Sequence, residues 1–195
     1  MGLKRELKSQ ASPKKAKLLQ RFFKTSPGEY GQGDVFLGVV VPETRKIVKK
    51  YTALSLRDAI RLLHSKIHEE RLAALLILVS TFAKATADKS KIYNLYLKNT
   101  KYINSWDLVD LSAHKIVGEY LSQGKNFSIL TKLAKSKNVW ERRIAVMATF
   151  NFIKNNRFTE SLKLAEILLN DDHDLIHKAV GWMLREVGKR DLKTE

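Results

Sequence analysis

The sequence predicts an all-α protein, and three observations carry that prediction. Its 195 residues include only three prolines and nine glycines, so few positions force a helix to break. Apolar residues recur at i, i+3, i+4 and i+7 in one segment after another, which is the spacing of a helix with one buried face. No stretch alternates apolar and polar residues clearly enough to indicate a strand.

The N-terminal part of the chain is basic and predicts an amphipathic helix. Residues 3–24 carry eight lysines and arginines and a single acid, Glu6. Ser12 and Pro13 are typical of a helix start, and apolar residues follow at helical spacing, namely Leu18, Leu19, Phe22 and Phe23. We therefore expect a helix on this segment rather than a disordered basic arm.

A glycine-rich segment, 25–38, separates that helix from two more. It lacks the strand–loop–helix context and the Gly-Lys-Ser/Thr ending of a phosphate-binding loop, so we expect turns there. Pro42 predicts the start of a helix that runs to Lys50, and Ser55 predicts the cap of another that runs to Leu63.

From residue 68 the pattern repeats as helix, short turn, helix. The expected helices cover 68–83, 88–100, 104–121 with a break near Ser112, 125–136, 139–154, 157–170 and 173–190. Helix pairs that recur about every 35–40 residues are typical of an α-solenoid of HEAT-like antiparallel pairs. We therefore predict a single helical-repeat domain over residues 1–195, with a concave basic face suited to a long ligand.

Charge is the most informative bulk property of the chain. Lys and Arg number 36 against 20 Asp and Glu, which gives a formal net charge of +16 and a pI of about 10.0. An excess of this size favours a polyanionic partner, with nucleic acid first and an acidic membrane surface second. A basic surface without such a partner is the alternative that charge alone leaves open.

Several classes of function are excluded or disfavoured. The chain has no cysteine, which removes disulfides, thiolate catalysis and Cys-ligated metal sites. The histidine pairs 64/68 and 173/177 lack an H-E-x-x-H frame and a third ligand, so we expect surface or capping histidines, no metal and no cofactor. No nucleophile elbow, Walker motif or dinucleotide motif is present. With no spanning run and no secretory signal, we expect a cytoplasmic protein.

Trp106 and Asp110 lie four residues apart in the segment 101–111, K-Y-I-N-S-W-D-L-V-D-L. If Asn104 or Ser105 caps a helix there, the indole and the carboxylate share one face of its first turns. A partly buried Trp beside a surface Asp is the ordinary interpretation. The pairing is nevertheless unusual for a plain core helix in so basic a chain.

The last predicted helix carries a stripe separate from its apolar face, made of Lys178, Trp182, Arg185 and Lys189. Cations around an aromatic ring are suited to gripping a nucleic-acid backbone. A Trp packed under the stems of Lys and Arg is the alternative, and the spacing does not decide between them.

A third candidate segment is 135–144, K-S-K-N-V-W-E-R-R-I. Asn138 is expected to cap a helix, and Arg142 and Arg143 follow on different faces. Arg143 lies beside an apolar face and needs a partner. Phosphate matches a guanidinium best, and a buried ion pair with Asp or Glu is the competing explanation.

Six segments together resemble the DNA alkylation repair family of the AlkD-like type. They are G-E-Y-G-x-G-D-x-F-L-G-V at 28–39, V-P-E-x-R-K at 41–46, H-E-E-R-L-x-A-L-x-I-L at 68–78, N-x-W-D-L-V-D at 104–110, W-E-R-R at 140–143 and D-L-I-H-K-A-V-G-W-M-L-R-E at 174–186. No single segment is diagnostic, but their order and combination are fairly specific. The resemblance covers the chain from about residue 18 to residue 190.

The resemblance implies an α-solenoid that excises cationic alkylated purines, such as N3-methyladenine and N7-methylguanine, from duplex DNA. It implies no metal, no cofactor and no deep base-binding pocket of the kind that base-flipping glycosylases use. Carried over by motif, the catalytic residues are Trp106, Asp110, Arg143 and Trp182. Asp110 would stabilise an oxocarbenium-like sugar, the indoles would face the cationic sugar and base, and Arg143 would hold phosphate.

The predicted partner is double-stranded DNA with alkylated bases. We expect Lys137, Arg142, Lys178, Arg185 and Lys189 to contact this DNA, and we expect a monomer that is free of membrane and associated with the nucleoid. A non-catalytic HEAT-like module that binds nucleic acid is the alternative. The chain departs from the pattern at Glu195, where relatives continue with further helical sequence. It would then lack a C-terminal repeat, as a shortened chain, a naturally short member or a fragment.

Overall fold

The computed structural model describes residues 2–84, 86–124 and 127–191. These residues form two compact units, of which the first comprises 1–87 with 102–108 and the second 88–101 with 109–195. Helix α7 (Trp106–Ala113) therefore begins in the first unit and continues in the second. Within the described ranges every named element is helical, and an isolated bridge joins Val35 to Ile67. The predicted all-α class is confirmed.

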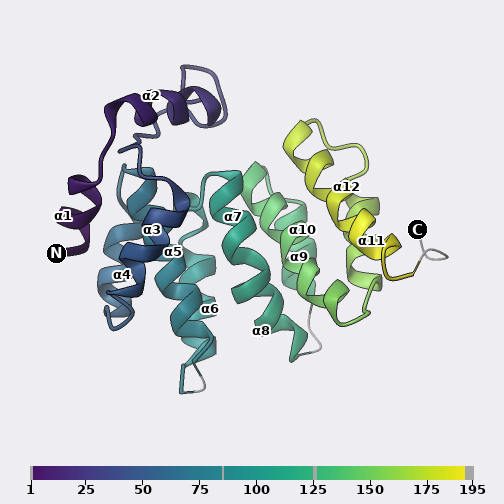
Figure 1. Ribbon diagram of the computed structural model, residues 1–195. Coiled ribbons are helices and arrows are strands. Elements are labelled where there is room, and N and C mark those ends of the chain that lie inside the picture. Colours follow the sequence, from purple (N-terminus) through teal and green to yellow (C-terminus); the bar gives the residue numbers. More distant parts are fainter. Residues whose placement is uncertain (1, 85, 125–126, 192–195) are drawn as a thin grey trace. The chain divides into compact units, whose positions relative to one another are not determined.

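The first unit is built around one buried helix. Its helices are α1 (Gly2–Ser9), α2 (Pro13–Phe22), α3 (Val41–Lys49), α4 (Leu56–Leu63) and α5 (His68–Phe82). The buried residues of α5 continue around the helix instead of following one stripe, which is typical of a helix enclosed by others. Helices α3 and α4 pack against α5, and α1 packs against α3 and α5 (Figure 1).

Helix α2 packs loosely on this unit and is anchored at its start. Ser12 caps it as predicted, since its hydroxyl accepts a hydrogen bond from the Lys15 N–H, and the Ser12 N–H donates to the Leu37 carbonyl at 2.8 Å. No residue of α2 is buried, and Leu18 and Phe22 are 61% and 64% exposed. Helix α1, which precedes it, was not anticipated as a separate helix.

The second unit is likewise built around a central helix. Its helices are α6 (Lys89–Lys98), η1 (Thr100–Tyr102, shared with the first unit), η2 (His114–Gly118), α8 (Glu119–Ser122), α9 (Ser128–Ala134), α10 (Val139–Lys154), α11 (Thr159–Ile167) and α12 (Asp174–Gly188). Helix α10 contacts η2, α8, α9, α11 and α12, and most of its side chains are buried. The prediction for this helix, 139–154, matches its bounds.

The break expected near Ser112 is a π-helical turn, and it begins two residues later. Helix α7 ends at Ala113, η2 forms the π turn, and α8 continues from Glu119. Such turns are common at functional sites, and this one directly follows the turn that bears Asp110. It also brings the chain against α10, because a Cβ on Gly118 would lie 2.2 Å from the Ala148 carbonyl oxygen.

Replacing Gly118 by Ala is expected to lower the free energy of unfolding by about 1–3 kcal/mol, since the added methyl group meets backbone that cannot move aside cheaply. Gly181→Ala is the matched control. That glycine lies in α12, and apart from its chain neighbours and the backbone of its own helix no atom lies within 4 Å of its Cβ position, so alanine there should stabilise the helix by about 0.5–1 kcal/mol. Urea titrations of both variants measure the difference, and equal effects would contradict the close approach.

The remaining helix bounds agree with expectation to within a few residues. The start of the predicted helix 125–136 includes residues 125–126, which lie outside the described residues, and α9 begins at Ser128. Among the residues that the structure describes, none of the helices combines the length and the apolar character needed to cross a membrane. The expectation that residues 1–195 form a single domain stays a prediction.

Candidate active site

Asp110 and Arg143 form a two-pronged ion pair in the second unit. Arg143 donates from Nε to Asp110 Oδ1 and from Nη2 to Asp110 Oδ2, both at 2.8 Å. The Asp110 side chain keeps 17% of its surface exposed, whereas Arg143 keeps 6%. The pairing therefore fixes the orientation of a carboxylate that still reaches solvent.

The rest of the Arg143 guanidinium is also engaged. Its Nη1 donates to the carbonyl oxygen of Leu175 at 2.5 Å, at the start of α12. The sequence left two partners open for Arg143, and the structure shows an ion pair with a carboxylate, that of Asp110. The role expected from the resemblance, that of holding phosphate, does not fit this geometry.

Trp182 is connected to the surroundings of Asp110 by a short series of contacts. Its indole lies 6.4 Å from the ring of Phe150, and that ring lies 5.6 Å from the His114 ring, measured between centroids. His114 Nδ1 is 3.0 Å from the carbonyl oxygen of Asp110. Burial, together with Lys115 and Lys154, lowers the pKa of His114 to about 4, so the ring is neutral at pH 7.

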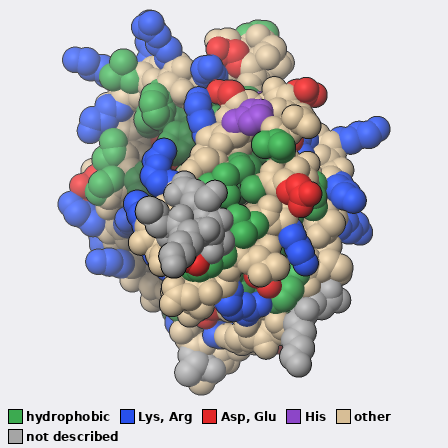
Figure 2. Space-filling model, turned by 90° about the vertical axis from the view of Figure 1, so that its right-hand side faces the viewer, with side chains coloured by type: hydrophobic (Ala, Val, Ile, Leu, Met, Phe, Trp, Pro, Cys, Tyr) green, Lys and Arg blue, Asp and Glu red, His purple; other side chains and the backbone are tan. Residues whose placement is uncertain are grey.

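The cationic stripe of α12 lies on the surface, as the sequence predicted. Trp182 is 38% exposed, and Lys178, Arg185 and Lys189 are exposed as well. Lys178 and Lys189 each pair with an acid on their own helix, at 2.8 Å and 2.6 Å. Exposed pairs of this kind contribute about 0–1 kcal/mol, so a phosphate can replace the acid at little cost. Figure 2 shows Lys and Arg side chains mostly around the edge of the view, with fewer Asp and Glu side chains among them.

The two remaining candidates for DNA contact, Lys137 and Arg142, differ in exposure. Lys137 is exposed, in the turn before α10. Arg142 is largely buried and bound to Asp171, with Nε at 2.7 Å and Nη2 at 3.2 Å from its carboxylate oxygens. It also donates to the carbonyl oxygen of Ser136. Asn138 caps α10 as predicted. Arg142 thus joins the turn before α10 to the turn before α12.

Trp106 belongs to the first unit, where it is part of an aromatic cluster. Its indole stacks on Phe23 at a centroid distance of 5.2 Å and an interplanar angle of 12°, and it meets Phe22 edge-on at 6.0 Å. Phe36 stacks on the opposite side of the cluster, 5.0 Å from Phe23. Trp106 is partly exposed, at the first residue of α7.

Beneath this cluster lies a buried ionic group that the sequence did not anticipate. His68 is 2% exposed and bridges two carboxylates, with Nδ1 at 3.0 Å from Asp34 and Nε2 at 2.8 Å from Asp107. Burial opposes a charge on the ring, but the bonds and charges of Asp107 and Asp34 outweigh it and raise the pKa of His68 to about 9. Arg71 also binds Asp34, at 2.5 Å.

The expectation of a surface or capping role is therefore wrong for His68 and right for His173, whose ring caps α12. The signal available for His68 was its place in H-E-E-R, the first turn of α5, directly before the apolar run 72–79. Its partners at positions 34 and 107 are distant in sequence and could not be paired with it by spacing.

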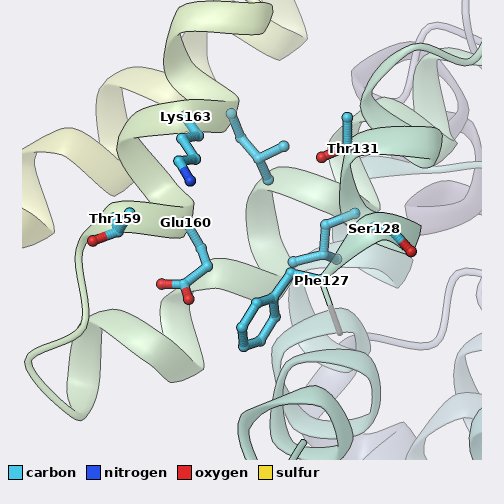
Figure 3. A pocket seen from close by; sticks show the side chains of 8 residues that line it. Phe127, Ser128, Thr131, Thr159, Glu160 and Lys163 are labelled. Atoms are coloured by element: carbon cyan, nitrogen blue, oxygen red, sulfur yellow. The ribbon is translucent and has the colours of Figure 1, made fainter. Parts of the chain in front are cut away.

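Two cavities are relevant to the predicted site residues, one in each unit. One of about 210 Å³ in the second unit is lined by α9 and α11 side chains (Figure 3), and it holds none of the predicted site residues. One of about 370 Å³ in the first unit includes Trp106, Asp107 and His68 in its lining. The described residues contain no group of three or more His, Asp or Glu that could hold a metal ion.

The fold and the net charge together indicate the class of protein to which the chain belongs. Paired helices around buried central helices, in a strongly basic chain, are consistent with an α-solenoid of the HEAT-like kind. A predicted DNA alkylation repair enzyme from Enterococcus faecalis has the same fold, with a TM-score of 0.67 and 17% identity over 94% of this chain and 86% of that one.

The family is shown by the sequence itself. The family model for DNA alkylation repair enzymes matches residues 3–195, and the chain belongs to this family. A comparison with curated protein sequences gives no match. The resemblance inferred from the six segments is confirmed.

Proposed function

We propose that the chain is a monofunctional DNA glycosylase that excises cationic alkylated purines, of the N3-methyladenine and N7-methylguanine type, from duplex DNA. Membership of the DNA alkylation repair family supports the class of reaction. The observation that carries the mechanism is the Asp110 carboxylate, partly exposed and held in a fixed orientation by Arg143.

The reaction needs a stabiliser of positive charge rather than an acid. Alkylation at N3 or N7 leaves the purine cationic, so the base departs as a neutral molecule when the C–N bond breaks and its nitrogen keeps the bonding electron pair. The positive charge then moves onto the deoxyribose, as an oxocarbenium-like transition state. A carboxylate about 4 Å from that charge contributes about 4 kcal/mol at the effective dielectric constant of a protein surface. Water then adds to C1′ and releases a proton.

Arg143 acts on this step through Asp110. Its two parallel hydrogen bonds hold both carboxylate oxygens, and its third bond, to Leu175, ties the pair to α12. The guanidinium charge offsets part of the attraction that Asp110 exerts on the sugar. In return, the carboxylate needs no reorientation during the reaction, which is the main requirement of electrostatic catalysis. Arg143 is therefore a positioning residue.

The other residues bind the substrate. Trp106 and Trp182 would offer their π-faces to the cationic sugar and base. Lys137, Lys178, Arg185 and Lys189, all exposed, would neutralise phosphates, and binding should weaken steeply with salt. Arg142 is left out of this set because its guanidinium is bound to Asp171.

The decisive assay measures release of 7-methylguanine or 3-methyladenine from methylated duplex DNA by chromatography. We expect release by the wild-type protein and none from unmodified DNA. Salt-sensitive binding without release would replace the proposal with a non-catalytic nucleic-acid-binding module. Failure to bind duplex DNA at low salt would remove both interpretations.

Arg143→Lys tests the positioning role. Lysine keeps the charge but can offer only one direction of contact, so the carboxylate loses its fixed orientation. We expect base release to fall by about 10–100-fold, since displacements near 1 Å have effects of that size, and stability to fall by about 1–3 kcal/mol.

Arg142→Lys is the matched control. It breaks another ion pair between an arginine and an aspartate, with Asp171, on the neighbouring residue of the same helix. The control should lose similar stability and keep its rate of release. If both variants lose the same activity, Arg143 contributes only to folding.

A further inference from the structure

Residues on both sides of Trp106 are tied to the buried ionic group of the first unit. Asp107 follows the indole in sequence, and its Oδ2 lies 2.8 Å from His68 Nε2. Asn104 precedes it by two positions, and its Nδ2 lies 3.5 Å from Asp34 Oδ1. Trp106 is the first residue of α7, so no earlier turn of that helix fixes its direction. The direction of the indole therefore depends on how the ionic group holds the start of the helix.

The geometry around His68 requires a charged ring. Its Nδ1 lies 3.0 Å from a carboxylate oxygen of Asp34, and its Nε2 lies 2.8 Å from one of Asp107. Ionised carboxylates only accept hydrogen bonds, so each ring nitrogen has to donate, which the imidazolium alone can do. A neutral ring would turn one nitrogen lone pair toward a carboxylate. The charge on His68 is thus what allows two carboxylates to share one buried ring.

The other charged groups around His68 are already engaged or lie in solvent. Arg71 binds Asp34, and its Nη2 lies 3.5 Å from His68 Nδ1. Glu69 accepts hydrogen bonds from the N–H groups of residues 37–39. The cations of α2 and of the turn after it are exposed, namely Lys14, Lys15, Lys17, Arg21 and Lys24. Among the residues that the structure describes, Asp107 has His68 as its one ion-pair partner. Loss of the His68 proton would leave that largely buried carboxylate without a cation and favour its movement toward water.

A second connection between His68 and Trp106 runs through stacked rings. The His68 ring stacks on Phe36 at a centroid distance of 4.4 Å and meets Phe23 at 5.0 Å. Phe23 in turn stacks on the indole of Trp106 at 5.2 Å. A cation beside an aromatic ring is attracted to it, and Phe23 is buried although its neighbour Phe22 is 64% exposed. The imidazolium therefore holds Phe23, and Phe23 supports one face of the indole.

We propose that the charged His68 is a positioning residue for base release, because it holds the Trp106 indole in place through Asp107 by one route and through Phe23 by the other. His68 is 2% exposed, so it acts through Trp106 rather than on the substrate. This role rests on the proposed function, in which the indole offers its π-face to the cationic sugar and base. The link between His68 and Trp106 rests on the contacts of the first unit alone.

The link between the two residues can be measured without DNA. Protein labelled with 5-fluorotryptophan gives three ¹⁹F signals, from Trp106, Trp140 and Trp182, and Trp106→Phe identifies the first. We expect the Trp106 signal to move as pH rises through the pKa of His68, about 9, and the other two signals not to follow this titration. A Trp106 signal that stays constant over the titration, or that moves equally in His68→Gln, would overturn the proposal.

Base release tests whether the position of the indole matters for the reaction. His68→Gln should lower the single-turnover rate of release by about tenfold, within the range of one cation–π contact. Binding of unmodified duplex DNA should stay as in the wild type, since no exposed cation is altered. Because His68 acts through Trp106, the same substitution should have no further effect on the rate in a Trp106→Ala background. Effects of the two substitutions that multiply would overturn the proposal.

Glu70→Gln is the matched control. Glu70 lies two residues after His68 in the same turn of α5, is 1% exposed and pairs with Lys4 of α1 at 2.6 Å. The control also removes a charge from a buried ion pair, but the partner lies on α1 rather than beside Trp106. It should keep both the rate of release and the response of the Trp106 signal to pH. Equal losses of rate in the two variants would overturn the positioning role.

The two measurements separate this proposal from the proposed function. If the wild-type protein releases no base, the glycosylase is removed, whereas a Trp106 signal that follows His68 still supports the positioning of the indole. If base is released but the signal does not follow His68, the glycosylase stands and the positioning role is overturned. If His68→Gln does not fold, the titration of the wild-type protein still decides, because it needs no change at His68.

Discussion

Asp110→Asn is expected to lower the rate of base release by about 10²–10³-fold, the effect typical of removing one electrostatic stabiliser of a transition state. Asparagine keeps the size and one oxygen acceptor for Arg143, but it removes the negative charge that the oxocarbenium-like sugar requires. Binding of unmodified duplex DNA should be unchanged or slightly tighter, because a carboxylate near phosphates opposes binding. Single-turnover release assays and salt titrations of binding measure the two quantities separately.

The variant also leaves Arg143 with a neutral partner, so a loss of folding must be distinguished from a loss of chemistry. Asp171→Asn serves that purpose, since Asp171 forms an ion pair with Arg142 within the same unit. Both variants should lose about 1–3 kcal/mol of stability. The rate of base release should fall strongly in Asp110→Asn and not in Asp171→Asn. An unchanged rate of release in Asp110→Asn would contradict the electrostatic mechanism.

His68 should make the stability of the protein depend on pH in the alkaline range. Its pKa rises from 6.5 to about 9 on folding, so the folded state holds the proton more tightly than the unfolded chain. The stabilisation is complete below about pH 6.5 and is lost as pH rises toward 9. At about 1.4 kcal/mol per unit the difference is of the order of 3 kcal/mol. Urea unfolding at a series of pH values measures it.

His68→Gln should flatten this dependence, because an amide cannot carry the proton that joins Asp34 to Asp107. His64→Gln, an exposed histidine in the turn before α5, should leave it intact. His114 does not confuse the measurement, since its pKa is lowered to about 4 and its own effect appears only as pH falls below 6.5. A pH profile that is equally steep in both variants would place the proton elsewhere.

The helices and the candidate residues were accessible to sequence reasoning for different reasons. Residues 139–154 form a helix with the bounds predicted, because caps and apolar spacing are local signals. Trp106 and Asp110 were singled out by their spacing of four, and α7 does carry both. The cationic stripe on α12 could also be recognised from the spacing of its residues, and these residues are exposed.

Partners that are distant along the chain were not accessible in the same way. Arg143 had two candidate partners, and the choice of Asp110 depends on how η2 and α10 pack. His68 appeared to be a surface residue, but two carboxylates 34 positions before it and 39 after it enclose it. Spacing carries no information on such pairs, since the energy that joins them comes from burial and charge in three dimensions.

By itself, then, the sequence determined the all-α class, the membership of the DNA alkylation repair family and the residues around which a site can be built. Helix period, capping and the order of the motifs depend on residues that are close in sequence, so they can be recognised without knowledge of the fold. Only the tertiary structure decided that Arg143 pairs with Asp110, and that a buried His68 and an aromatic cavity lie beside Trp106. Those features depend on which side chains are buried together, and the packing of distant segments determines which side chains these are.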